Sequence, residues 1–101
     1  MKKYELYELQ PKADNFIADV ETGDEAVEAA MKYFTKKFKD LIVKNTIKHQ
    51  VSAINGQVQI EIGCMTNQGF IILDTFELRK GNPFRDIFVS KGFHTNIIPS
   101  N

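Results

Sequence analysis

Three residues of this sequence are of the types that a thiol enzyme uses. His49, Cys64 and Asp74 could serve as base, nucleophile and orienting carboxylate. The strand registers predicted below place their side chains on one face of a sheet, within two rungs of one another. A helix should cover that face, whereas a reactive thiolate needs an accessible, electropositive setting. We therefore assign no catalytic residue. A thiol enzyme ranks third among the functions considered, after protein interaction and nucleic-acid binding, which are described below.

The same residues have structural interpretations. A lone cysteine in a core is usually a small hydrophobe, and a lone histidine on an apolar face is usually hydrogen-bonded there. For Asp74 we expect either a one-residue bulge that turns it outward or a hydrogen bond to a buried polar group such as the His49 ring. Each of the three residues can therefore be explained without catalysis.

Neither a metal site nor a cofactor site is predicted. His49, His94 and Cys64 lack the close paired spacings of a zinc motif. The sequence contains no Gly-x-Gly-x-x-Gly and no Gly-Lys-Ser/Thr, so no phosphate-binding loop of these types is present. We expect no cofactor and no metal.

Asn55-Gly56 gives the clearest structural signal, because both residues tolerate the positive φ of a tight hairpin turn. If Ile54 faces Gln57, every other pair of the hairpin from Ile47 to Cys64 follows. The pairs on the apolar face are Ala53 with Val58, Val51 with Ile60, His49 with Ile62 and Ile47 with Cys64. The pattern therefore predicts a sheet with one buried and one solvated face.

Before this hairpin, residues 3–9 and 15–21 alternate as strands do. Thr22 and Glu25 form a capping box that predicts a helix from Gly23 to Leu41. Its apolar residues recur at helical spacing: Val27, Ala30, Met31, Phe34, Phe38 and Leu41. This amphipathic helix should cover the apolar face of the sheet.

After Cys64, Asn67-Gln68-Gly69 suits a three-residue loop leading into a strand over residues 70–79. That register pairs Cys64 with Ile72, Ile62 with Asp74 and Ile60 with Phe76. Asn82-Pro83 then predicts a short helix over residues 83–91, although 87–89 also suits a strand. The fold class is therefore α+β: an antiparallel sheet (ββ-α-βββ, then a short C-terminal helix) with one main amphipathic helix on one face.

Composition limits the classes of function. The 101 residues form one expected domain, 1–101, and 13 basic residues balance 13 acidic ones, so no overall field favours nucleic acid or membrane. The single cysteine excludes an intramolecular disulfide and favours a reducing compartment. No stretch approaches the ~20 apolar residues of a membrane span. We expect a cytoplasmic protein that does not bind membranes.

A lysine-rich helix face gives the alternative function, nucleic-acid binding. It comprises Lys32, Lys36, Lys37 and Lys39. The order of the two helices and the three-strand meander resembles double-stranded RNA-binding domains in outline. Such domains have a basic, glycine-containing start to their last helix, whereas this chain has Asn82-Pro83-Phe84-Arg85-Asp86-Ile87. The lysines also have a structural interpretation, because basic side chains near a helix C-terminus complement its dipole.

Apolar residues in excess of what one helix and one sheet face need predict an interface. In the expected register Ile71 and Leu73 point to the otherwise polar face. The predicted interface residues are Ile71, Leu73, Phe84, Phe88, Phe93 and Ile97. We therefore expect a small non-enzymatic protein-interaction module that binds a protein partner or itself, as a homodimer in the latter case. We expect a protein of the bacterial or phage accessory, regulatory or inhibitor kind.

Overall fold

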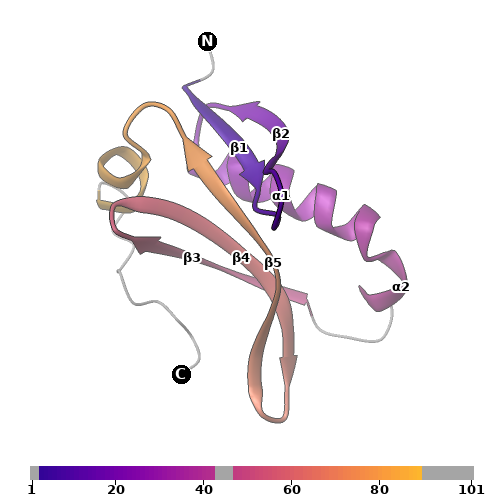
Figure 1. The fold of residues 1–101 in the computed structure, drawn as a ribbon. Coiled ribbons are helices and arrows are strands. Elements are labelled where there is room, and N and C mark those ends of the chain that lie inside the picture. The colour runs from indigo at the N-terminus through magenta and orange to yellow at the C-terminus, as the bar shows by residue number, and fades with distance from the viewer. Residues whose placement is uncertain (1–2, 43–46, 90–101) are drawn as a thin grey trace.

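The computed structural model describes residues 3–42 and 47–89 of the chain (Figure 1). In chain order the elements are β1 (Tyr4–Glu8), β2 (Asn15–Val20), α1 (Gly23–Lys37), α2 (Lys39–Ile42), β3 (Ile47–Ile54), β4 (Gln57–Thr66), β5 (Gly69–Arg79) and η1, a π-helix (Phe84–Val89). The five strands form one antiparallel sheet in the order β2-β1-β5-β4-β3. The predicted α+β class is confirmed.

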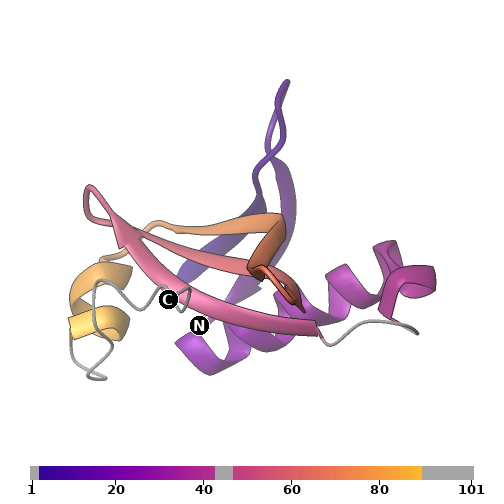
Figure 2. The same cartoon turned by 90° about the horizontal axis from the view of Figure 1, so that it is seen from below.

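The helix α1 covers one face of this sheet, which we call the inner face, and Figure 2 shows it on that side. Helix α1 contacts β2, β4 and β5. Its buried residues are Ala26, Ala30 and Phe34. They pack with sheet residues that include Leu6, Val20, Val58, Ile60, Ile62, Phe76 and Leu78. We call the opposite side the outer face.

The start of α1 follows the predicted capping box. The Glu25 amide donates to Thr22 Oγ1 at 3.1 Å, and the Glu25 carboxylate accepts from the Glu21 amide at 2.6 Å. The helix does not continue to Leu41 as predicted. It ends at Lys37, because Phe38 leaves helical geometry (φ −116°, ψ 39°), and the short helix α2 follows.

Strands β3, β4 and β5 form a meander of two hairpins. The β3–β4 hairpin has the register expected from the sequence at every pair, from Ile54–Gln57 to Ile47–Cys64. Asn55 and Gly56 have φ values of 53° and 79°, so both adopt the left-handed conformation that the turn requires. The turn chemistry alone was therefore sufficient to predict this register.

The second hairpin differs from the prediction. Ile60–Phe76 and Ile62–Asp74 pair as expected, but the register then shifts so that Gly63 pairs with Ile72 and Cys64 with Ile71. The shift leaves Leu73 as an extra residue, a β-bulge. The loop is correspondingly shorter, with Thr66 paired to Gly69 across Asn67-Gln68. The predicted Cys64–Ile72 pair is therefore wrong.

The segment after β5 forms the expected short helix, as the π-helix η1. The Arg85 amide donates to Asn82 Oδ1 at 3.1 Å, which is a helix cap, and Phe84 packs against the core. Tyr4 of β1 donates to Asp86 at 2.9 Å and fastens η1 to the sheet. No helix within residues 3–42 and 47–89 has the length and apolar character needed to cross a membrane.

Candidate functional site

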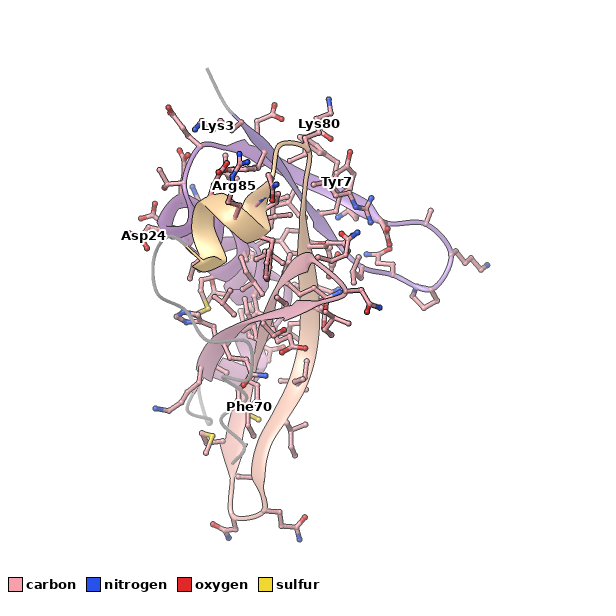
Figure 3. The ribbon with its side chains drawn as sticks, turned by 90° about the vertical axis from the view of Figure 1, so that its left-hand side faces the viewer. Lys3, Tyr7, Asp24, Phe70, Lys80 and Arg85 are labelled. Carbon is pink, nitrogen blue, oxygen red and sulfur yellow. The ribbon has the colours of Figure 1, made fainter. Side chains whose placement is uncertain are left out.

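The end of the β4–β5 hairpin is the most apolar exposed feature of the described chain. Residues 63–72, which we call the arm, project away from the rest of the sheet (Figure 1). Met65, Ile71 and Ile72 are 42%, 47% and 45% exposed. Figure 3 shows the arm, marked by Phe70, at the end of the molecule away from Lys80.

The arm also lacks charge. No Asp, Glu, Lys or Arg occurs from residue 62 to residue 73, although 26% of the chain is charged, which would give about three in twelve residues. Depletion of charge distinguishes the centres of protein interfaces from the rest of a protein surface. The arm therefore combines exposure, apolar side chains and neutrality.

Close backbone contact at its base sets the direction of the arm. A Cβ atom on Gly63 would lie 1.8 Å from the Ile71 carbonyl oxygen, so only glycine fits opposite the bulge. At the tip, Thr66 Oγ1 donates to the Gly69 carbonyl at 2.9 Å and accepts from the Gln68 amide at 3.1 Å. These contacts give the arm a defined geometry.

The bulge also changes the assignment of the predicted interface residues. Ile71 is exposed but lies on the same face as Cys64, not on the outer face as predicted, and Leu73 is partly buried against the core. Phe84 packs against the core as well. The side chain of Phe88, together with Phe93 and Ile97, lies outside the described residues.

Sequence reasoning missed two exposed members of the arm, Met65 and Ile72. Beyond the bulge, Met65 pairs with Phe70 and Ile72 pairs with Gly63. This register places the side chains of Met65 and Ile72 on the outer face. The charge-free stretch from residue 62 to residue 73 was a signal that could have identified them.

The outer face beside β1 is different from the arm, because it carries ion pairs. Arg79 pairs with Glu77 at 2.8 Å and with Asp14, and its guanidinium lies 4.3 Å from the Tyr7 ring. Phe16, 48% exposed, packs edge-on against Tyr7 with 5.5 Å between the ring centroids. This part of the outer face is therefore compatible with exposure to solvent.

A buried carboxyl pair lies on the inner face near the C-terminal end of α1. Glu8 is fully buried, and it accepts hydrogen bonds from Tyr33 at 2.9 Å and Gln10 at 2.7 Å. The Nζ atom of Lys37 lies 2.5 Å from Glu8 Oε2 and 3.7 Å from Asp74 Oδ2. Asp74 is 8% exposed, and its Oδ2 has no hydrogen-bond donor.

The two carboxyl groups titrate in opposite directions. Burial disfavours ionisation of Glu8, but hydrogen bonds from Asp74, Lys37 and Tyr33 outweigh it and lower the pKa of Glu8 to about 2. Burial, followed by the hydrogen bond and the charge of Glu8, raises the pKa of Asp74 to about 7. When Asp74 is protonated, its Oδ2 becomes a hydroxyl that can donate to Glu8, which gives this buried atom a partner.

These contacts give Asp74 partners other than His49. Asp74 did stay on the inner face opposite Ile62, but Glu8 and Lys37 are its partners. It is neither turned outward by the bulge nor placed to serve His49. Cys64 is 7% exposed and buried.

The four residues of the lysine-rich helix face differ in their surroundings. Lys37 is held by the buried carboxyl pair and lies 5.4 Å from the Phe38 ring centre. Lys32, Lys36 and Lys39 are exposed. Three of the four predicted nucleic-acid contacts thus remain accessible to a phosphate backbone.

A hollow of about 380 Å³ lies between the first half of α1 and the inner face of β3, β4 and β5. Asp24, Glu28 and His49 line it, above a floor that includes Val58 and Ile60. Val58 and Ile60 are 0% and 2% exposed, so these two floor residues offer a ligand little surface to cover. We do not assign it as a binding site.

Nothing in the described residues assembles a metal centre. Within residues 3–42 and 47–89, no three His, Cys, Asp or Glu side chains are grouped so that they could hold a metal ion. Comparisons of the chain with protein-family models, with curated proteins and with solved structures gave no match.

Proposed function

We propose that this chain is a small non-enzymatic protein-interaction module that assembles as a homodimer, with the arm as a contact surface. The observation that carries the proposal is the charge-free arm with Met65, Ile71 and Ile72 exposed. An accessory, regulatory or inhibitory role, of the kind that bacterial and phage proteins of this size perform, belongs to the same proposal. So does a cytoplasmic location, which the unpaired Cys64 favours.

A second copy is the occupant that the arm suits best. Two neutral surfaces meet without like-charge repulsion, and the whole chain has a formal net charge of +0. Two-fold homodimers are the commonest closed assemblies, and they need only one self-complementary patch. Covering Met65 and Ile72, which share the outer face and are 42% and 45% exposed, supplies apolar burial to drive the association.

The non-enzymatic part of the proposal is supported by the surroundings of the reactive residue types. Cys64 is buried rather than accessible, and Asp74 is engaged with Glu8 and Lys37. Nucleic-acid binding stays the alternative, carried by the exposed Lys32, Lys36 and Lys39. It is weakened by the acidic first turn of α1, which contains Asp24 and Glu25.

Sedimentation velocity over a range of protein concentrations tests the proposal. We expect a monomer–dimer equilibrium, and Met65→Asp or Ile72→Asp, both on the outer face of the arm, should each raise its Kd at least about tenfold, because a carboxylate would be desolvated. The matched control is Phe16→Asp, which places the same charge at a similarly exposed aromatic on β2, away from the arm. A monomer at every concentration, or arm variants that dimerise like Phe16→Asp, would refute self-association through the arm.

The alternative has its own test. If the lysines bind nucleic acid, the native protein should be retained on a heparin column, and replacing Lys32, Lys36 and Lys39 with glutamate should abolish that retention. Retention that disappears in this triple variant while the arm variants behave normally would favour the nucleic-acid hypothesis.

A further inference from the structure

The two edges of the sheet are protected to different degrees. On one edge, β2 pairs with β1 through a shifted register: Leu6 faces Ala18 while Tyr7 faces Phe16, which leaves Ile17 unpaired. Bulges of this kind, and charges such as Asp19 on the same strand, are devices that prevent edge strands from pairing with other chains. The β2 edge is therefore blunted.

The β3 edge has fewer of these devices. Its eight residues, Ile47–Ile54, pair with β4 without a register shift and include no proline. Lys48 is the single charged residue in that span. Since an antiparallel ladder directs every second residue's N–H and C=O away from the neighbouring strand, β3 presents a regular row of backbone donors and acceptors with which no other strand of residues 3–42 and 47–89 pairs.

A polar side chain at the middle of β3 also has an unmet hydrogen bond. Gln50 is 7% exposed, and its Nε2 donates to Glu61 Oε1 at 2.6 Å. Its Oε1 is buried and has no hydrogen-bond partner. A buried amide oxygen without a donor costs about 1–3 kcal/mol, which a partner strand could recover.

We propose that β3 pairs antiparallel with β3 of a second copy, about a two-fold axis through Gln50, to join two five-stranded sheets into one. This inference rests on the proposed homodimer and specifies its central contact. The axis is perpendicular to the sheet, so the inner faces of the two copies stay on the same side and both α1 helices remain where they are.

This register satisfies the side chains that it brings together. Gln50 faces Gln50 of the second copy, and a rotation of the amide that brings Oε1 to the axis lets each Oε1 accept from the other copy's second Nε2 hydrogen. Lys48 faces Ser52, so no two charges of the same sign are opposed. On the inner face, Ile47 lies opposite Ala53, and the apolar surface continues from one copy to the other.

The same register connects β3 to the arm. It places Ile54 of one copy at the same level along the sheet as Met65 of the other, two strand spacings or about 10 Å apart between backbones. Ile54 is 51% exposed and Met65 is 42% exposed, and both lie on the outer face. The pairing thus lets two of the exposed apolar side chains cover each other.

Cysteine cross-linking tests the register directly. In a Cys64→Ala background, Gln50→Cys should form an intermolecular disulfide under mild oxidation, because residues at the axis have Cα atoms within the 4.4–6.8 Å that a disulfide spans. The matched control is Ser52→Cys in the same background, since the two Ser52 positions would lie about 14 Å apart. Non-reducing gels and intact mass report the yield, and circular dichroism of the reduced variants confirms the fold.

Each result has a distinct meaning. Rapid cross-linking at position 50, with little at position 52, supports the proposed axis. Cross-linking at position 52 instead, or a dimer in sedimentation that does not cross-link at position 50, overturns the register but leaves the homodimer standing. A wild-type chain that is monomeric at every concentration overturns both proposals. As a second measurement without cysteine, Gln50→Lys should raise the dimer Kd at least about tenfold by opposing two like charges.

Discussion

Replacing Asp74 with asparagine separates the charge of the buried carboxyl pair from its hydrogen bonds. An asparagine amide can donate to Glu8 as a protonated Asp74 does, but it cannot ionise. The pKa of Asp74 is raised from 3.8 to about 7 in the folded protein. Because the folded value is the higher one, the stability that Asp74 contributes is fully present below pH 3.8 and is lost as pH rises through about 7.

The size of the effect follows from the same values. A difference of about three pKa units corresponds to at most about 4 kcal/mol, and we expect about 2 kcal/mol after Asp74 relaxes toward solvent. The contribution of Glu8 has the opposite pH dependence: its pKa is lowered from 4.5 to about 2, so this contribution is fully present above pH 4.5 and is lost as pH falls from there through about 2. Above pH 4.5 the change in stability with pH is therefore assigned to Asp74.

Urea denaturation followed by circular dichroism, from pH 4.5 to above pH 8, measures this difference. Wild type begins to lose its Asp74 contribution at pH 3.8, so we expect the stability of Asp74→Asn relative to wild type to increase as pH rises from 4.5 and to level off above about pH 7, with about 2 kcal/mol as the full difference from the acid limit. Asp19→Asn, an exposed carboxylate on β2, is the matched control and should follow wild type. A variant that is less stable than wild type by the same amount at every pH would refute the shared proton.

Three further outcomes are expected from the described contacts. Gly63→Ala should lower the free energy of unfolding by at least about 2 kcal/mol, because its Cβ would overlap the Ile71 carbonyl; chemical denaturation measures this. Lys37→Met should cost about 2 kcal/mol by leaving the buried carboxyl pair uncompensated, whereas Lys36→Met on the exposed helix face should change stability by less than about 0.5 kcal/mol. Cys64 should resist iodoacetamide at neutral pH until the protein is unfolded, and labelling of the native protein at the rate of free thiol would contradict its burial.

The parts of the fold that depend on local chemistry were predictable. Asn55-Gly56 requires positive φ at two successive residues, so it determined the turn and every pair of the β3–β4 hairpin. Thr22 and Glu25 likewise located the start of α1. In both cases neighbouring residues decide the outcome, and no distant contact has to be known.

The β4–β5 register was only half predictable, because a bulge depends on how two backbones approach. The apolar alternation of residues 70–79 continues through Leu73 without a break, so sequence alone favoured Cys64 opposite Ile72. The determining contact is between Gly63 and the Ile71 carbonyl, and a glycine in a strand can also signal other features. The assignment of Ile71 to a sheet face failed for this reason.

The buried carboxyl pair could not be predicted, because it depends on non-local pairing. Glu8 joins Asp74 only because β1 pairs with β5, and nothing in either strand specifies the other as its partner. One signal was present: Tyr4, Leu6 and Glu8 alternate on the same side of their strand, and the first two are the apolar members. A carboxylate that continues an apolar alternation is a candidate for a buried, partnered group.

The strand order has a consequence for how the protein is made on the ribosome. The N-terminal hairpin of β1 and β2 can only complete its packing against β5, the last strand of the sheet to be synthesised. At about 5–20 residues per second, that hairpin therefore waits for several seconds while the intervening chain emerges. During this time β1 exposes an unpaired edge and the carboxylate of Glu8 remains in water. The sheet can close only after residue 79 has left the exit tunnel, so folding of the domain is expected to begin in the meander and to recruit the N-terminal hairpin last.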